Sequence, residues 1–168
     1  MQRKSTTKTQ PNKFRMVEFG AGSATTLERK AMRDYNRHYI AVDPIYRQAK
    51  VPLTIPKSTR TMRSFIKEMK RRKIHSERLV LNTPTPDDII QKKLRIDILF
   101  KEAKNVLTKK GKIVITSEHP DLIDLVEFLA KKNGMQVRAK RTLKVPSTDV
   151  QRQLMEMGKP IQMVVFSF

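Results

Sequence analysis

The chain has 168 residues, enough for one domain with a sizeable core, and its 36 lysines and arginines against 16 acidic residues leave a formal net charge of +20 at pH 7. The absence of cysteine excludes disulfides, thiolate metal sites and a cysteine nucleophile, and no apolar run approaches the ~20 residues needed to cross a bilayer. So large a charge favours a polyanionic partner, RNA rather than a membrane surface, because an interfacial anchor would need more large aromatic side chains.

Residues 1–13 are basic, rich in hydroxyl groups and free of acidic residues. They predict a flexible basic arm, and a role of this arm in organelle targeting stays open. Residues 14–168 are expected to form a single domain. Its first strand is predicted over 14–19, where the apolar residues run directly into Gly20.

Helices and strands then alternate along the chain. Thr25 or Thr26 can cap a helix after the first strand, and a second strand is predicted over 39–42. This order makes a βαβ unit, so the sheet is expected to be parallel. The remaining predicted elements are a strand within 51–55, a helix over 58–73, a strand over 78–81, a helix over 87–107, a strand over 113–116, a helix over 120–132, a strand over 135–143, a short helix to Met157 capped within 147–149, and a last strand over 161–168.

The long helix over 87–107 is predicted from its apolar spacing. Ile90, Leu94 and Ile98 lie four residues apart and would share its inner face. Two lysines followed by Gly111 are typical of a helix end.

Two acidic residues flank the predicted glycine turn in the sequence. Glu18 precedes Gly20 and Gly22, and Asp43 follows at the end of the next strand, where an acid can bind both hydroxyls of a ribose. A dinucleotide site would place a third glycine where Thr25 stands. Because the charge of Glu18 suits a cation better than a diphosphate, these residues indicate a nucleoside with a cationic group near the turn.

The stretches VEFGAGSAT and YIAVDP resemble the nucleotide-binding motifs of the class I S-adenosylmethionine-dependent methyltransferases. The resemblance implies a Rossmann-like α/β fold with a mostly parallel sheet, helices on both faces and an antiparallel hairpin formed by 135–143 and 161–168. It also implies S-adenosylmethionine as the cofactor. The residues implied to hold it are Glu18, Gly20, Ala21, Gly22 and Asp43.

The stretch NTPTP, residues 82–86, stands where these enzymes carry their substrate-side loop. It resembles the N-P-P-Y loop of amino-methylating enzymes without its aromatic residue, and its layout is loosely closest to that of the tRNA guanine-N7 methyltransferases. Asn82 is therefore expected to hydrogen-bond the substrate. Asp87 and Asp88 are candidate bases, although both would equally suit the amino terminus of a helix.

The predicted function is methylation of RNA, a tRNA or rRNA base, in the cytoplasm. The alternatives are an inactive methyltransferase-like RNA-binding or ribosome-associated protein and, from another class, a nicotinamide-dependent oxidoreductase. No metal site and no membrane contact are expected, whereas a protein partner or a second copy of the chain stays open. The cations expected to contact RNA, unless they only form a solvated surface, are Arg60, Arg63, Lys67, Lys70, Arg71, Lys92, Lys93 and Arg95.

Overall fold

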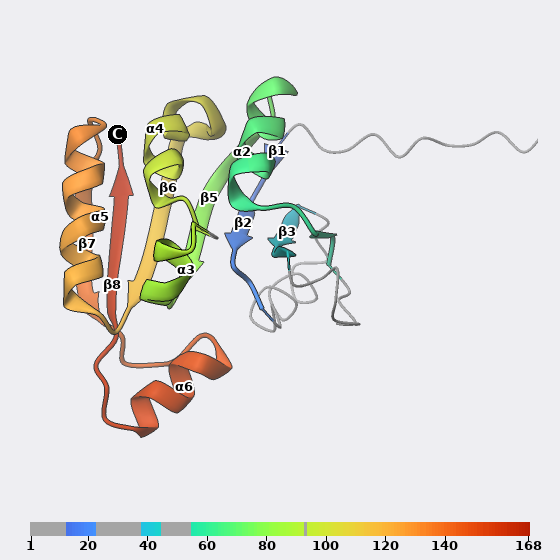
Figure 1. Cartoon of the computed structure of the whole chain (residues 1–168). Coiled ribbons are helices and arrows are strands. Elements are labelled where there is room, and N and C mark those ends of the chain that lie inside the picture. Colours follow the sequence, from blue (N-terminus) through green and yellow to red (C-terminus); the bar gives the residue numbers. More distant parts are fainter. Residues whose placement is uncertain (1–12, 23–37, 45–54, 93) are drawn as a thin grey trace, which may run out of the picture.

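A computed structural model describes residues 13–22, 38–44, 55–92 and 94–168 of the chain (Figure 1). Its strands are β1 (Lys13–Phe14), β2 (Met16–Phe19), β3 (Tyr39–Val42), β4 (Lys57–Ser58), β5 (His75–Asn82), β6 (Leu107–Ser117), β7 (Gln136–Thr142) and β8 (Gln162–Ser167). Its helices are α2 (Met62–Arg71), α3 (Pro86–Ile90), α4 (Ile96–Val106), α5 (Pro120–Lys132) and α6 (Asp149–Glu156). None of these helices is long and apolar enough to cross a membrane.

The strands form one sheet in the order β4-β3-β2-β5-β6-β8-β7, with β1 paired to β5. All neighbours are parallel except β8, which runs antiparallel to both β6 and β7. This arrangement confirms the predicted mostly parallel sheet and its carboxy-terminal antiparallel hairpin.

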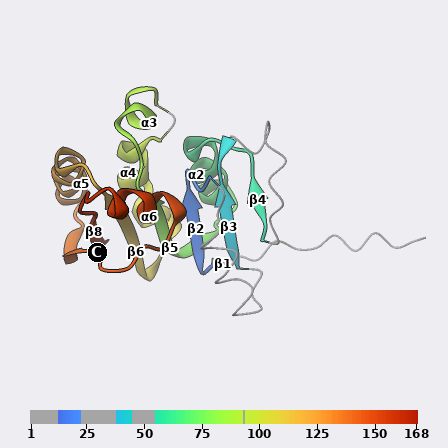
Figure 2. The same ribbon diagram turned by 90° about the horizontal axis from the view of Figure 1, so that it is seen from below.

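The main core lies between one face of the sheet and the helices α2, α4 and α5, which Figure 2 shows along the same side. Odd-numbered residues of the central strands, such as Leu79 and Ile113, point into it because side chains alternate along a strand. The apolar side of α2 packs there through Met62, Phe65, Ile66 and Met69, as its spacing predicts. The even-numbered residues of these strands face the opposite side. Residues 23–37 and 45–54 lie outside the described residues, and with them the helix expected after Thr25 or Thr26.

The predicted single helix over 87–107 is wrong, because α3 ends at Ile90 and α4 begins at Ile96. Lys92 has a φ of +57°, which a continuous helix does not allow, and the backbone N–H of Leu94 turns back to donate to the Asp88 carbonyl at 2.9 Å. Leu94 is buried, whereas Ile90 is 74% exposed. The four-residue spacing of Ile90, Leu94 and Ile98 therefore does not reflect one helix face, because these residues lie in different elements and differ in burial.

The predicted helix end at Gly111 is also wrong. β6 starts at Leu107, immediately after α4, and runs through both lysines and Gly111. Between its pairing with Ser76 and with Arg78, β6 advances from Leu107 to Lys112, so an irregularity bulges out of the ladder there. A side chain at Gly111 would lie 2.9 Å from the Thr108 carbonyl oxygen, so glycine is needed here for close packing rather than for a helix cap.

The helix predicted from Ser58 begins only at Met62, because Ser58 lies in the unpredicted strand β4 and pairs with Val42. The remaining described elements agree with the sequence to within a few residues. The helix over 120–132 has the predicted bounds, and Thr148 caps α6 by accepting a hydrogen bond from the Gln151 N–H. The first predicted strand is interrupted at Arg15, and Lys13, counted with the arm in the sequence, begins β1. Residues 1–12 lie outside the described residues, and so does most of the strand predicted within 51–55.

Candidate functional site

The carboxyl ends of the parallel strands β2, β3, β5 and β6 meet at one edge of the sheet. β2 leads into Gly20, β3 into Asp43, and β5 ends at Asn82. Ligands of open α/β sheets bind at this edge, where helices and loops leave the strands.

The glycine turn after β2 is fastened to the end of β3. The Gly20 N–H donates to the Val42 carbonyl at 2.9 Å, and the Gly22 N–H donates to Oδ2 of Asp43 at 3.0 Å. Gly20 and Gly22 have φ values of +64° and +52°, which favour glycine. A side chain at Gly20 would be in van der Waals contact with Leu94 at 3.4 Å, whereas no described residue lies within 4 Å of the place where a Gly22 side chain would start. The turn can therefore approach a ligand closely at Gly22.

Glu18 is buried, with 3% of its surface exposed, on the side of the sheet opposite the helices. Nδ2 of Asn82 donates to its Oε1 at 2.6 Å. Hydrogen-bond donors such as Asn82 stabilise a buried carboxylate, because an unsatisfied buried carboxylate costs more free energy than one hydrogen bond contributes to stability. The structure thus brings Glu18 and Asn82 together, with Glu18 before the glycine turn and Asp43 bound to its far end.

Gln151 is a site residue that the sequence did not predict. It is completely buried on α6, and its Nε2 donates to Oγ1 of Thr116 at 2.9 Å and to Oδ1 of Asn82 at 3.4 Å. Its Oε1 accepts from the N–H and the hydroxyl of Ser147 at 2.8 and 2.9 Å. The hydroxyl of Thr116 also donates to Oδ1 of Asn82, at 3.3 Å. The sequence carries no signal for this network, since Gln151 stands in a short polar helix where an outward side chain is the ordinary case.

Thr83 follows Asn82 in an unusual backbone conformation, with a φ of +47°. Its N–H donates to the Thr116 carbonyl at 2.9 Å and to the Thr116 hydroxyl at 3.1 Å. Left-handed backbone is rare for a β-branched residue and costs on the order of 1–3 kcal/mol. The loop over 82–86 therefore holds local strain where the sequence predicts the substrate side.

The two predicted candidate bases lie in different surroundings. Asp88 forms a capping box with Thr85, accepting from the Thr85 N–H and hydroxyl at 3.2 and 2.8 Å. Asp87 is exposed in the first turn of α3. The structure thus gives Asp88 a structural task and leaves Asp87 accessible at the carboxyl edge.

A cavity of about 360 Å³ opens over the sheet face beside this network. Glu18, Asn82 and Thr116 line one end of it, and Asp43 is not among its lining residues. The complete lining consists of Met16, Glu18, Arg78, Val80, Asn82, Lys112, Val114, Thr116, Arg141, Leu143, Ser147, Met163 and Val165.

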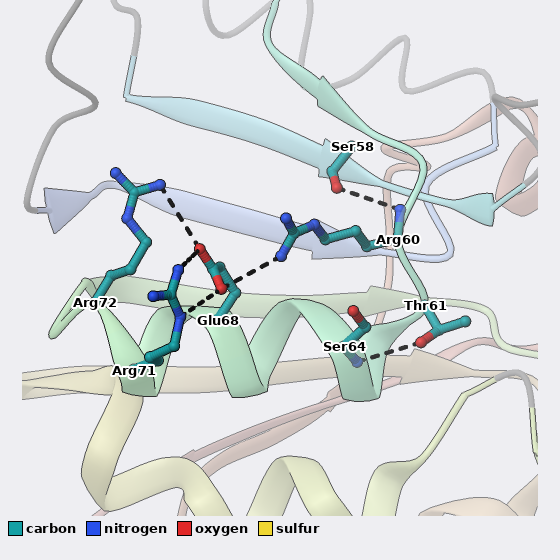
Figure 3. A network of polar contacts seen from close by, with 7 residues as sticks. All are labelled: Ser58, Arg60, Thr61, Ser64, Glu68, Arg71 and Arg72. Carbon is teal, nitrogen blue, oxygen red and sulfur yellow. Dashed lines mark hydrogen bonds and ion pairs between the residues drawn. The ribbon is translucent and has the colours of Figure 1, made fainter.

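The cations predicted to contact RNA divide into paired and unpaired groups. Figure 3 shows Glu68 on α2 surrounded by Arg60, Arg71 and Arg72, whose nitrogens lie 3.6, 2.7 and 3.8 Å from its carboxylate oxygens. The hydrogen bond from Arg71 lowers the pKa of Glu68, so this carboxylate stays charged. Lys70 pairs with Glu102 at 2.9 Å and Arg95 with Asp97 at 2.7 Å.

Three of the remaining predicted cations, Arg63, Lys67 and Lys92, are exposed. Within the described ranges they make no ion pair. The last, Lys93, lies outside the described residues.

No protein-family model and no curated protein match the sequence. Solved structures match the fold. An antibiotic-related methyltransferase has a TM-score of 0.64 at 14% identity, over 90% of this chain and 87% of that one. The 16S rRNA (adenine(1408)-N(1))-methyltransferase from Catenulisporales acidiphilia has a TM-score of 0.59 at 13% identity, over 90% and 84%.

The chain has the fold of the class I S-adenosylmethionine-dependent methyltransferases. A protein from Streptococcus mutans, described as a methyltransferase of this kind, has a TM-score of 0.62 at 11% identity. The match covers 91% of this chain and 44% of that protein, so the chain spans less than half the length of this methyltransferase-fold neighbour.

Proposed function

We propose that the protein is an S-adenosylmethionine-dependent methyltransferase that modifies a base of tRNA or rRNA. The observation that carries the proposal is the glycine turn after β2. Asp43 accepts a hydrogen bond from the Gly22 N–H of this turn, and Glu18, just before the turn, accepts one from Asn82. The methyltransferase fold supports the reaction class. The net charge of +20 and the likeness to an rRNA methyltransferase support RNA as the substrate and hence a cytoplasmic location.

The residues at the turn fit the cofactor. Asp43 stands at the tip of β3, where a carboxylate would bind the ribose hydroxyls. Because no residue of the described ranges lies within 4 Å of a side chain built at Gly22, the backbone of Ala21 and Gly22 could approach the ligand closely. Glu18 would lie toward the cationic end, where a buried negative charge is favourable. When bound, S-adenosylmethionine would supply a methyl group on an activated sulfonium.

The substrate side is built for orientation rather than for acid and base chemistry. Transfer of an already activated group needs the acceptor atom held in line, which can contribute much of the rate. Asn82 has a fixed side chain, because Glu18, Thr116 and Gln151 all contact it. We propose that Asn82 orients the target base and that Asp87, exposed at the start of α3, receives a proton where the acceptor carries one.

A second function, that of an inactive methyltransferase-like RNA-binding or ribosome-associated protein, is favoured by one observation. Both polar ends of the Asn82 side chain already have protein partners, so a substrate would have to replace one of them. In an inactive protein the same contacts would only stabilise the carboxyl edge.

Transfer of a labelled methyl group from S-adenosylmethionine to RNA distinguishes the two functions. We expect the full chain to label RNA from cells that lack the protein, and mass spectrometry of nucleosides from those cells to show one missing modified base. RNA binding without any label transfer would contradict the enzymatic function and leave the inactive one.

A further inference from the structure

A second group of cations lies on the sheet face opposite α2, α4 and α5. Arg78 on β5, Lys112 on β6 and Arg141 on β7 line the cavity that also contains Asn82 and Thr116. All three residues are exposed. Among the described residues, no carboxylate oxygen lies within 4.0 Å of their charged nitrogens. Their positive charges are therefore available to a ligand.

The strand register fixes where these cations stand. Arg78 is paired with Lys112, and Asn82 with Thr116, on the same two neighbouring strands. A strand rises about 3.3 Å per residue, so the Arg78 and Lys112 pair lies roughly 13 Å from the Asn82 network. Arg141 is level with Thr116, two strands away across Met163, which corresponds to about 10 Å.

An apolar floor separates the two cationic ends. Its accessible part consists of the half-buried Val114, Met163 and Val165, and the buried Met16 and Val80 continue it on the same face of the sheet. Cations at both ends of an apolar strip suit a nucleic acid strand, which presents phosphates along its backbone and the flat faces of its bases between them. A duplex would hide those faces.

The helix α2, in contrast, is less suited to phosphates than its sequence indicates. Arg60, Arg71 and Arg72 share the carboxylate of Glu68. This negative charge offsets part of their attraction for a phosphate and would repel one that came close. Within the described part of the chain, no carboxylate forms an ion pair with Arg78, Lys112 or Arg141, and Glu18 at the far end of this face is bound to Asn82.

We propose that Arg78, Lys112, Arg141 and the apolar floor between them, here called the sheet groove, bind a single-stranded RNA segment beside the Asn82 network. The proposal rests on RNA as the partner in the proposed function, but not on methyl transfer itself. The RNA backbone lies along Arg78 and Lys112, and Arg141 holds a phosphate beside the Asn82 network.

Binding of fluorescein-labelled oligouridylate, followed by fluorescence anisotropy, tests the sheet groove. The double variant Arg78→Glu/Lys112→Glu is expected to raise Kd roughly tenfold or more, because phosphate contacts dominate such affinities. The matched control Lys131→Glu/Lys132→Glu makes the same charge change in the exposed last turn of α5 and should change Kd far less. The milder variant Arg78→Gln/Lys112→Gln should lower the slope of log K against log salt by about 1.4, that is about 0.7 for each lost contact to a single strand.

Two outcomes overturn the sheet groove. Either the Arg78 and Lys112 variants bind the oligonucleotide as the Lys131 and Lys132 control does, or the affinity is lost instead in Arg63→Glu/Lys67→Glu on α2. Unchanged circular dichroism of each variant shows that it is folded, and Arg78→Gln/Lys112→Gln replaces the double glutamate variant if that one unfolds.

Calorimetry with S-adenosylmethionine separates this proposal from the proposed function. The sheet groove variants should bind S-adenosylmethionine as the native chain does, since Arg78 and Lys112 lie far from the glycine turn. Groove-dependent RNA binding without cofactor binding would support the groove and contradict the methyltransferase. If the native chain binds S-adenosylmethionine and the sheet groove variants keep the native affinity for RNA, the methyltransferase is supported and the sheet groove is contradicted.

Discussion

The side-chain amide of Asn82 donates a 2.6 Å hydrogen bond to the buried carboxylate of Glu18 and so links the loop over 82–86 to the strand before the glycine turn. The two residues are 64 positions apart in the chain, and the parallel pairing of β2 with β5 brings them side by side. This contact couples the two halves of the proposed active site.

Replacing Asn82 tests that coupling. Asn82→Ala removes the hydrogen bond that Asn82 donates to the buried Glu18 carboxylate, which should lower the free energy of unfolding by about 1–3 kcal/mol in urea titrations. The double variant Glu18→Gln/Asn82→Ala should lose less free energy of unfolding than the sum of the losses in the two single variants, because the effects of substituting residues in contact are not additive. Asn105→Ala is the control, since Asn105 binds Glu102 on the surface. Strict additivity would contradict the coupling.

Gln151 should hold α6 against the sheet. Gln151→Ala removes the donor to Thr116 and Asn82 and the acceptor for Ser147, so we expect a loss of about 1–3 kcal/mol in stability. We also expect faster amide hydrogen exchange confined to 144–158, because Gln151 is the buried residue of α6. Gln153→Ala, on the exposed side of the same helix, should change neither quantity. Equal protection of α6 in both variants would show that other contacts hold it.

Gly20 should be required for more than backbone freedom. Alanine at Gly20 or at Gly158, where φ is +64° and +73°, should cost a similar 1–2 kcal/mol of unfolding free energy, roughly the penalty of a left-handed backbone. Of the two substitutions, only Gly20→Ala changes the turn that Asp43 binds, where the new methyl group would be in van der Waals contact with Leu94 at 3.4 Å. It should weaken S-adenosylmethionine binding at least tenfold, while Gly158→Ala binds normally. Equal affinities in the two variants would place the cofactor elsewhere.

The arginine cluster around Glu68 should make stability depend on pH in a defined direction. The hydrogen bond from Arg71, with help from Arg60 and Arg72, lowers the pKa of Glu68. The contribution of the ionised Glu68 carboxylate to the stability of the fold is therefore complete above the ordinary glutamate pKa of about 4.3. It is lost as the pH falls through the lowered pKa. The thermal midpoint of Glu68→Gln should lie slightly below that of the native chain at pH 7, and the gap should close in acid.

Glu156→Gln, at the exposed end of α6 and outside any described ion pair, should show no such pH-dependent gap. A gap that widens on acidification would mean that protonated Glu68 is the stabilising form.

Much of the fold follows from the sequence because its signals are local. The glycine turn, the acid after β3 and the amphipathic sides of α2 and α5 each lie within one stretch of chain. The break between α3 and α4 was missed because Leu94 keeps the helical spacing while it turns to cover Gly20. Here a tertiary contact overrides the local pattern.

The site was harder to predict than the fold because its parts come from different strands. Glu18 and Asn82 could each be named, but their direct contact depends on the strand order. Gln151 could not be named, since only the packing of α6 turns it inward. Arg78 and Lys112 are ordinary surface cations in the sequence, and only the register of β5 with β6 makes them neighbours.

Calorimetric titration of the full chain with S-adenosylmethionine tests the central claim most directly, when it is repeated on Asp43→Ala and on the control Asp121→Ala in the first turn of α5. We predict that the native chain and the Asp121 variant bind the cofactor alike and that Asp43→Ala loses at least tenfold in affinity, because the ribose hydroxyls and the Gly22 N–H lose their acceptor. Failure of the native chain to bind S-adenosylmethionine, or equal binding by Asp43→Ala, would contradict it.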